Sequence, residues 1–224
     1  MTAGSIPVAA RPAPVAGRTP ELAVLLAPAF LVGALAAVVG ARWWATRAGI
    51  DPLAIGAVFG IALGALAIGR HGGWTLLVPR ALIGRAPNAR VVVSTGVGIA
   101  FGLGLVGLVL AGAALGGSMF VPGLGRPAAP FLPWAAITIL VASGEEALLR
   151  SRLFDAIRRA AGVMPAIAVT TLAFALMHVP LYGWHVVPLD LAVGLAFAGL
   201  RLATRSIAAP VAAHAVADLA TWWL

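Results

Sequence analysis

Residues 131–158 read FLPWAAITILVASGEEALLRSRLFDAIR, a long apolar stretch interrupted by two adjacent glutamates. The stretch is long enough for a helix that crosses a lipid bilayer, which needs about 20 predominantly apolar residues. A charged side chain inside such a span costs about 2.5 to 3.5 kcal/mol even on a lenient insertion scale, so Glu145 and Glu146 require a functional reason. The stretch therefore predicts a membrane-spanning helix that carries part of a polar site.

The composition of the whole chain also indicates a lipid environment. Of its 224 residues, 62% are hydrophobic and 10% are charged, and the mean hydropathy is +1.04, which lies outside the range of soluble domains. Six further apolar runs are candidate spans: 22–41, 53–69, 91–115, 165–182, 186–200 and 207–224. We expect an all-α, polytopic transmembrane bundle of about seven spans, with an active site within the membrane.

The domain organisation follows from where these runs lie. Residues 1–20 are rich in proline and lack a helical period, which predicts a disordered cytoplasmic tail. Residues 21–224 are expected to form one transmembrane helical domain. The apolar segment 74–83 is too short to span and is interpreted as interfacial. Gly56, Gly60 and Gly64 recur every four residues and predict a close helix contact.

The arginines predict the orientation. When successive connections are assigned to alternate sides of the bilayer, only Arg42, Arg47 and Arg126 fall on the side opposite the N-terminus, and the other twelve of the 15 basic residues share the N-terminal side. The positive-inside rule then places the N-terminus in the cytoplasm and the C-terminus outside. The basic residues are all arginine and the chain is rich in alanine and glycine, which favours a bacterial cytoplasmic membrane.

The net charge of +8 does not indicate a nucleic-acid partner, because the arginines stand singly or in pairs beside apolar runs. The expected partners are membrane lipids and a membrane-associated protein or peptide substrate, and the oligomeric state is left open. The chain has no cysteine, which excludes thiolate nucleophiles and cysteine-bound metals.

Rare ionisable residues fall at a common depth in three of the expected spans. Glu145, His178 and Asp218 each lie 13 residues from the Arg or Pro that marks the cytoplasmic end of the span, about 20 Å along a helix. His214 lies one turn away from Asp218. The remaining acids, among them Asp190, lie near span ends and are interpreted as outside the site. The common depth predicts one polar pocket shared by three helices.

Spacing within the helices adds a second constraint, because side chains four residues apart lie on one helix face. Adjacent Glu145 and Glu146 point about 100° apart, so Glu146 can be held by Arg150 while Glu145 faces the pocket as the working acid. Three pairs have the spacing of four: Glu146 with Arg150, Phe174 with His178, and His214 with Asp218.

These three pairs resemble, in order and spacing, the EExxxR, FxxxH and HxxxN/D motifs of the CPBP family. That family comprises CAAX prenyl proteases and bacteriocin-processing or Abi-type membrane proteins. The resemblance covers residues 129–224, the expected catalytic core. It implies an intramembrane endopeptidase that cleaves membrane-associated proteins, prenylated CAAX-type proteins among the candidates.

By this resemblance Glu145 activates the attacking water with help from His178, while His214 and Asp218 stabilise the oxyanion. The family often has Asn where this chain has Asp218, and an ionised Asp can only accept hydrogen bonds. We therefore favour a second role, in which Asp218 orients His214 and the histidine becomes the donor. The residues expected to support the site are Glu146, Arg150 and Phe174.

The family has also been described as metal-dependent. Glu145, His178 and His214 would then be the ligands of a divalent metal such as Zn, with an open fourth position. No HExxH motif is present. A glutamate-activated water is therefore favoured, with the metal left open.

Two other classes of function remain as alternatives. Buried Glu, His and Asp also form the relays of proton-coupled transporters and channels, although the chain shows no internal repeat of the kind those folds have. A non-catalytic immunity or scaffold protein would keep the fold without the chemistry. The Glu146 and Arg150 pair is equally well explained as a buried ion pair that fixes helix packing.

Overall fold

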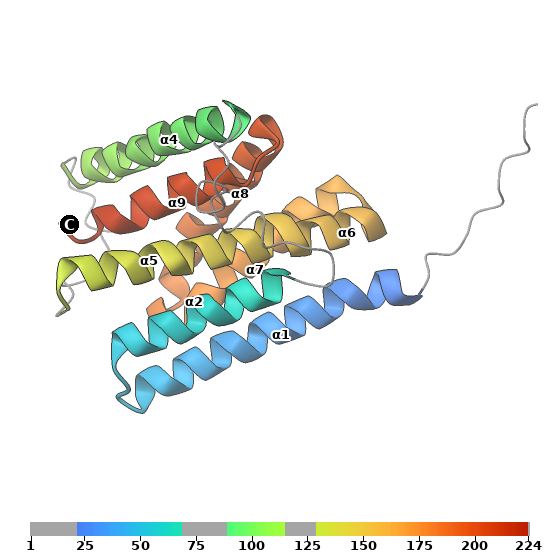
Figure 1. The fold of residues 1–224 in the computed structure, drawn as a ribbon, viewed down its shortest axis with the longest axis horizontal. Coiled ribbons are helices and arrows are strands. Elements are labelled where there is room, and N and C mark those ends of the chain that lie inside the picture. The colour runs from blue at the N-terminus through green and yellow to red at the C-terminus, as the bar shows by residue number, and fades with distance from the viewer. Residues whose placement is uncertain (1–21, 69–88, 115–128, 224) are drawn as a thin grey trace, which may run out of the picture.

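The computed structural model describes residues 22–68, 89–114 and 129–223, and every regular element in these ranges is a helix (Figure 1). This confirms the predicted all-α fold class. The predicted tail 1–20 and the interfacial segment 74–83 lie outside the described residues. The elements are α1 (Leu22–Arg47), α2 (Pro52–Ile68), α4 (Ala89–Ala114), α5 (Phe131–Glu146), η3 (Ala147–Leu153), α6 (Phe154–Ala161), α7 (Val163–Tyr182), η4 (Trp184–Val186), α8 (Val187–Thr204) and α9 (Ala208–Ala220).

The helices lie side by side in one bundle. Across the view of Figure 1 the order is α1, α2, α5, α9 and α4, and α7 and α8 pack against this row from behind. Connections between consecutive helices are short where the structure describes them, so neighbours such as α7 and α8 run antiparallel. The element α5, its continuation η3, α7 and α9 meet in the middle of the bundle.

Five helical segments are long and apolar enough to cross a membrane. The other two apolar helices are shorter, with 17 residues in α2 and 13 in α9. The predicted count of seven spans is therefore not confirmed. For α9 the shortening lies at the C-terminal end: the helix begins at Ala208, one residue after the expected start, but ends at Ala220, and the N–H groups of residues 221–223 then bond carbonyl oxygens three residues back.

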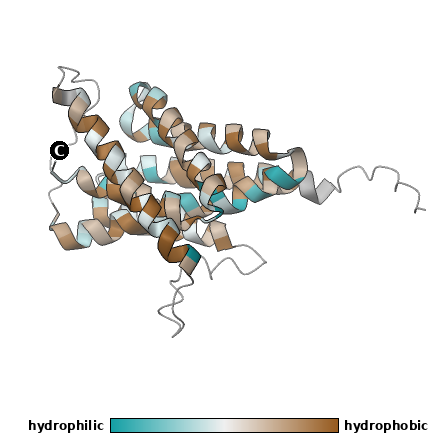
Figure 2. Cartoon of the chain, turned by 90° about the horizontal axis from the view of Figure 1, so that it is seen from above, coloured by the Kyte–Doolittle hydropathy of each residue, from teal (hydrophilic) through white to brown (hydrophobic). Residues whose placement is uncertain are grey.

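Apolar side chains cover the outside of the bundle and charged side chains lie inside it, as expected for a protein surrounded by lipid. Large apolar side chains lie exposed on the outside, among them Phe30, Val58 and Leu132, which are between 66 and 76% accessible. Apolar residues colour most of the helix length in Figure 2, with hydrophilic residues confined to few positions. Charged side chains instead occur inside, where Glu145, Glu146 and Arg150 are buried. The chain is an integral membrane protein.

Small residues allow the helices to approach closely. A Cβ added at Gly56 would lie 2.6 Å from a methyl group of Ile137, and one at Gly60 would lie 2.8 Å from Leu140, so α2 and α5 touch along these glycines. On α4, a Cβ at Gly98 would overlap the carbonyl oxygen of Ala209 in α9. In lipid, where apolar burial drives helix pairing little, such backbone contacts supply the packing. They place α5 and α9, which carry site residues, in the centre.

Candidate active site

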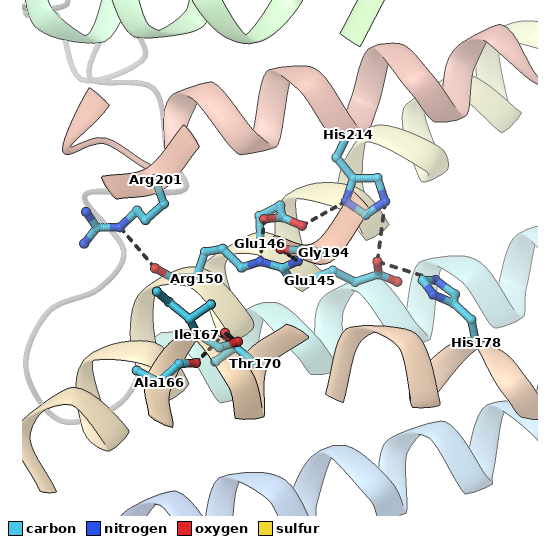
Figure 3. A network of polar contacts seen from close by, with 10 residues as sticks. All are labelled: Glu145, Glu146, Arg150, Ala166, Ile167, Thr170, His178, Gly194, Arg201 and His214. Carbon is cyan, nitrogen blue, oxygen red and sulfur yellow. Dashed lines mark hydrogen bonds and ion pairs between the residues drawn. The ribbon is translucent and has the colours of Figure 1, made fainter. Parts of the chain in front are cut away.

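The two adjacent glutamates lie at the C-terminal end of α5, inside the bundle. Oε2 of Glu145 is 3.7 Å from Nε2 of His214 on α9 and 4.0 Å from Nε2 of His178 on α7 (Figure 3). The Glu145 side chain is only 2% exposed. The structure thus brings together the three helices whose ionisable residues were expected to share one depth, and two imidazoles converge on a single carboxylate.

Glu146 belongs to the same buried cluster. Its Oε1 lies 3.1 Å from Nδ1 of His214, and its Oε2 lies 3.5 Å from Nε of Arg150. The sequence predicted the contact with Arg150, which is present, but not the one with His214. The His214 ring is therefore held between neighbouring carboxylates, with Nδ1 on Glu146 and Nε2 toward Glu145.

Asp218 lies at the rim of this cluster. Its Oδ2 is 3.4 Å from Nε2 of His214, so the predicted pairing of these two residues is present. The Asp218 side chain is nevertheless 41% exposed, although the sequence places it at the same expected depth as the buried Glu145. The reason is that α9 ends at Ala220, which leaves Asp218 in the last helical turn.

Phe174 contacts more of the site than the sequence predicted. Its ring packs edge-to-face on His178, with 4.9 Å between centroids, and on His214, with 5.5 Å. The Arg150 guanidinium lies over the same ring, 4.6 Å from its centroid. Edge-to-face pairs and cation–π contacts of this kind each fix relative orientation. Phe174 therefore holds both histidines and the arginine in place.

Arg150 is fully buried and is held from three sides. Besides Glu146 and Phe174, its Nη2 donates a hydrogen bond to the carbonyl oxygen of Gly194 on α8, at 3.2 Å. A Cβ at Gly194 would lie 3.2 Å from the Phe174 ring and 3.4 Å from Nη2, so any larger residue would press on the Phe174 ring. The arginine thereby links α8 to the site.

The segment after the glutamates departs from a regular α-helix. Residues Ala147–Leu153 form the π-helix η3, inside one continuous helical segment from Phe131 to Ala161. The sequence-based depth estimate assumed the rise of an α-helix throughout, and that assumption was wrong here. A π-helical turn is wider than an α-helical turn, and its backbone hydrogen bonds join residues five apart. Within this segment the carbonyl oxygen of Arg150 also accepts a hydrogen bond from Nε of Arg201 on α8, at 3.1 Å. Single π-helical turns of this kind are frequent at functional sites.

Sequence reasoning missed Asp190, in the first turn of α8. Its Oδ2 lies 3.1 Å from Nδ1 of His178, and its side chain is 18% exposed. We had interpreted Asp190 as lying outside the site because it stands near a span end. A usable signal was present, since only residues 183–186 separate α7 from α8, and antiparallel neighbours joined so tightly bring residues close to the connection together.

The suggested metal ligands do not form a metal-binding group as they are arranged. Among the residues that the structure describes, no group of three or more His, Asp or Glu side chains is placed to hold a metal ion. Donor atoms around a tetrahedral Zn lie about 3.3 Å apart, given metal–ligand distances near 2.0 Å. The two imidazole nitrogens lie 3.7 and 4.0 Å from Glu145 Oε2. The metal remains a prediction, and no step below uses it.

Comparison with known proteins points to the same part of the chain. Residues 127–220 match the family described as type II CAAX prenyl endopeptidase, Rce1-like. This segment contains Glu145, His178, His214 and Asp218, and the match confirms the resemblance to the CPBP family that their motifs indicate. No curated protein and no solved structure matches the chain.

Proposed function

We infer that this chain, whose residues 127–220 form an Rce1-like segment, is an intramembrane endopeptidase in which Glu145 activates water for attack on a peptide bond. The observation that carries this proposal is the convergence of His178 and His214, from two different helices, on Glu145, which is buried and makes no ion pair with an arginine in the part of the chain that the structure describes. A carboxylate so placed is accessible as a general base, whereas Glu146 is engaged by Arg150.

In the proposed reaction Glu145 first takes a proton from water and then gives it to the leaving amine. As the water oxygen forms a bond to the carbonyl carbon, the Glu145 carboxylate takes the water proton and the carbonyl electron pair moves to its oxygen. When the carbon–nitrogen bond then breaks, the leaving amine takes the proton from Glu145, which restores the carboxylate. His178, 4.0 Å from the same oxygen, holds the base in position between these two transfers.

His214 is suited to stabilise the oxyanion. A carboxylate can only accept hydrogen bonds, so the contact with Glu146 requires a proton on Nδ1 of His214. Nε2 then faces the pocket, and in the doubly protonated ring it is a donor with Asp218 3.4 Å away. We assign Asp218 the role of a counterion at the rim, consistent with its partial exposure.

The lipid that surrounds the helices determines which class of substrate can reach the site. Because the exterior is apolar and the site lies among membrane helices, the substrate is a protein or peptide held at or in the membrane. The family that residues 127–220 match is described as a type II CAAX prenyl endopeptidase family. For this chain a prenylated substrate is one member of the proposed class.

The decisive experiment replaces the proposed base. We expect Glu145→Gln to reduce cleavage of a membrane-tethered peptide, with and without a prenylated CAAX end, by about 10²- to 10⁴-fold in detergent. Asp155→Asn is the matched control, because this acid lies on α6, away from the site, and forms an ion pair with the exposed Arg158. Cleavage by the Glu145 variant at the wild-type rate would refute the proposed base.

Two further arms separate the alternatives. Loss of cleavage on adding a zinc chelator, restored by Zn, would favour the metal-dependent mechanism over the one proposed here. Proton flux in liposomes that requires Glu145, without cleavage of any tested peptide or of any protein in the membrane proteome, would favour a transporter.

A further inference from the structure

Both histidines of the site lie between two carboxylates. In each ring Nε2 faces Glu145, and in each ring Nδ1 faces a second carboxylate, Glu146 for His214 and Asp190 for His178. Both Nδ1 distances are 3.1 Å. The second carboxylates come from different helices, α5 and α8, so the repeated geometry does not follow from helical spacing.

The Asp190 contact is not shared with other groups. His178 Nδ1 and Asp190 Oδ2 are both buried atoms, and neither makes a hydrogen bond to any other described residue. Their separation of 3.1 Å is within hydrogen-bond range, but the present orientation of the two groups does not make a hydrogen bond. Such contacts are often poorly aligned before substrate binds and tighten in the reacting complex. Burying both atoms would be costly unless they are partners.

We propose that Asp190 is a positioning residue that keeps the proton of His178 on Nδ1 and so directs Nε2 at Glu145. This inference rests on the function proposed above and extends it to a residue outside the three motifs. A carboxylate on Nδ1–H fixes both the tautomer and the orientation of an imidazole. With the ring so fixed, Nε2 presents the same atom to Glu145 throughout the reaction.

A purely structural role for the contact is the competing explanation, because Asp190 also ties α8 to α7. The two explanations differ in what happens to the ring when the acceptor is removed without loss of the fold. A structural tie changes stability alone, whereas a positioning residue also determines which ring nitrogen carries the proton.

The test therefore reads the tautomer directly. The chain has four histidines, so ¹⁵N-histidine labelling in detergent gives few signals, and His178→Gln assigns those of His178. In the wild-type protein we expect the proton of His178 on Nδ1. In Asp190→Leu we expect a mixture of both tautomers, and in Asp190→Asn, whose amide oxygen still accepts, the wild-type tautomer.

Kinetics supply the second readout. We expect Asp190→Leu to lower kcat by about 10- to 100-fold with little change in KM, and Asp190→Asn to recover most of the loss. Asp155→Asn serves again as the control. A wild-type His178 with its proton on Nε2, or an unchanged spectrum in Asp190→Leu, overturns the proposal. Because the spectrum needs no substrate, this result is independent of whether the protein proves to be a peptidase.

Should Asp190→Leu fail to fold, Asp190→Ala and Asp190→Asn are compared in its place. A folded Asp190→Ala protein that keeps the wild-type tautomer would equally refute the positioning role.

Discussion

Replacing Arg150 by methionine tests how the site is built, because methionine keeps much of the side-chain volume and removes the charge. Arg150 is fully buried, pairs with Glu146 at 3.5 Å, donates to the Gly194 carbonyl and lies over the Phe174 ring. Its loss leaves Glu146 with His214 but without the arginine, and leaves the Gly194 carbonyl without a donor. The damage is therefore expected to be electrostatic more than steric.

The expected change in the free energy of unfolding follows from these contacts. Breaking a buried ion pair by removing one partner costs about 3 to 5 kcal/mol, because the remaining charge is left uncompensated. Replacing both partners removes that uncompensated charge. We therefore expect Arg150→Met to lower the free energy of unfolding by about 3 to 5 kcal/mol, and Glu146→Gln combined with Arg150→Met to cost less than the two single changes added together.

Unfolding in dodecyl maltoside micelles with rising amounts of sodium dodecyl sulfate, followed by circular dichroism, measures these differences. Arg159→Met is the control, since Arg159 is exposed on α6 and its change should cost less than about 0.5 kcal/mol. If Arg150→Met were no less stable than this control, or if the double variant showed full additivity, the assignment of Arg150 and Glu146 as a coupled buried pair would be wrong.

Three further predictions concern packing, the π-helix and orientation. Gly98→Ala should cost about 1 to 3 kcal/mol, because its Cβ would overlap the backbone of α9, whereas Gly104→Ala, with open space around it, should cost nothing measurable in the same unfolding assay. Arg201→Met should cost about 1 to 3 kcal/mol by leaving a carbonyl of the π-helix without its donor, and an unchanged midpoint would contradict that role. Because the chain has no cysteine, Thr46→Cys and Ser206→Cys variants can each be labelled at a single site with an impermeant maleimide in intact cells. If the N-terminus is cytoplasmic, only the cysteine at position 46 should react. Reaction of the cysteine at position 206 alone would show the opposite orientation.

Much of the site could be predicted from the sequence, because its strongest signals are local. A carboxylate or imidazole inside an apolar run is costly wherever the run lies, so Glu145, His178 and His214 were identifiable without knowing the fold. Spacing of four residues predicted the contacts of Glu146 with Arg150 and of Phe174 with His178, both of which the structure contains.

The remaining features depend on how different helices meet. The contact of Glu146 with His214 and that of Asp190 with His178 each join residues of separate helices, so no periodicity within one helix reveals them. The carbonyl oxygen of Arg150 in the π-helix accepts a hydrogen bond from Arg201 on α8, which is again a tertiary contact. Helix ends, as at Asp218, were the least predictable feature, since turns and caps rather than hydropathy decide them.

The shortness of α9 has a consequence for the supply of water to the reaction. Its 13 residues extend only about 20 Å, while the hydrocarbon layer is about 30 Å thick. His214 lies at its midpoint, six residues or about 9 Å from either end. A helix this short obliges the bilayer to thin beside it or lets the aqueous phase enter along it. Either effect would bring water nearer to His214 and to Glu145, whose Oε2 lies 3.7 Å from Nε2 of that ring.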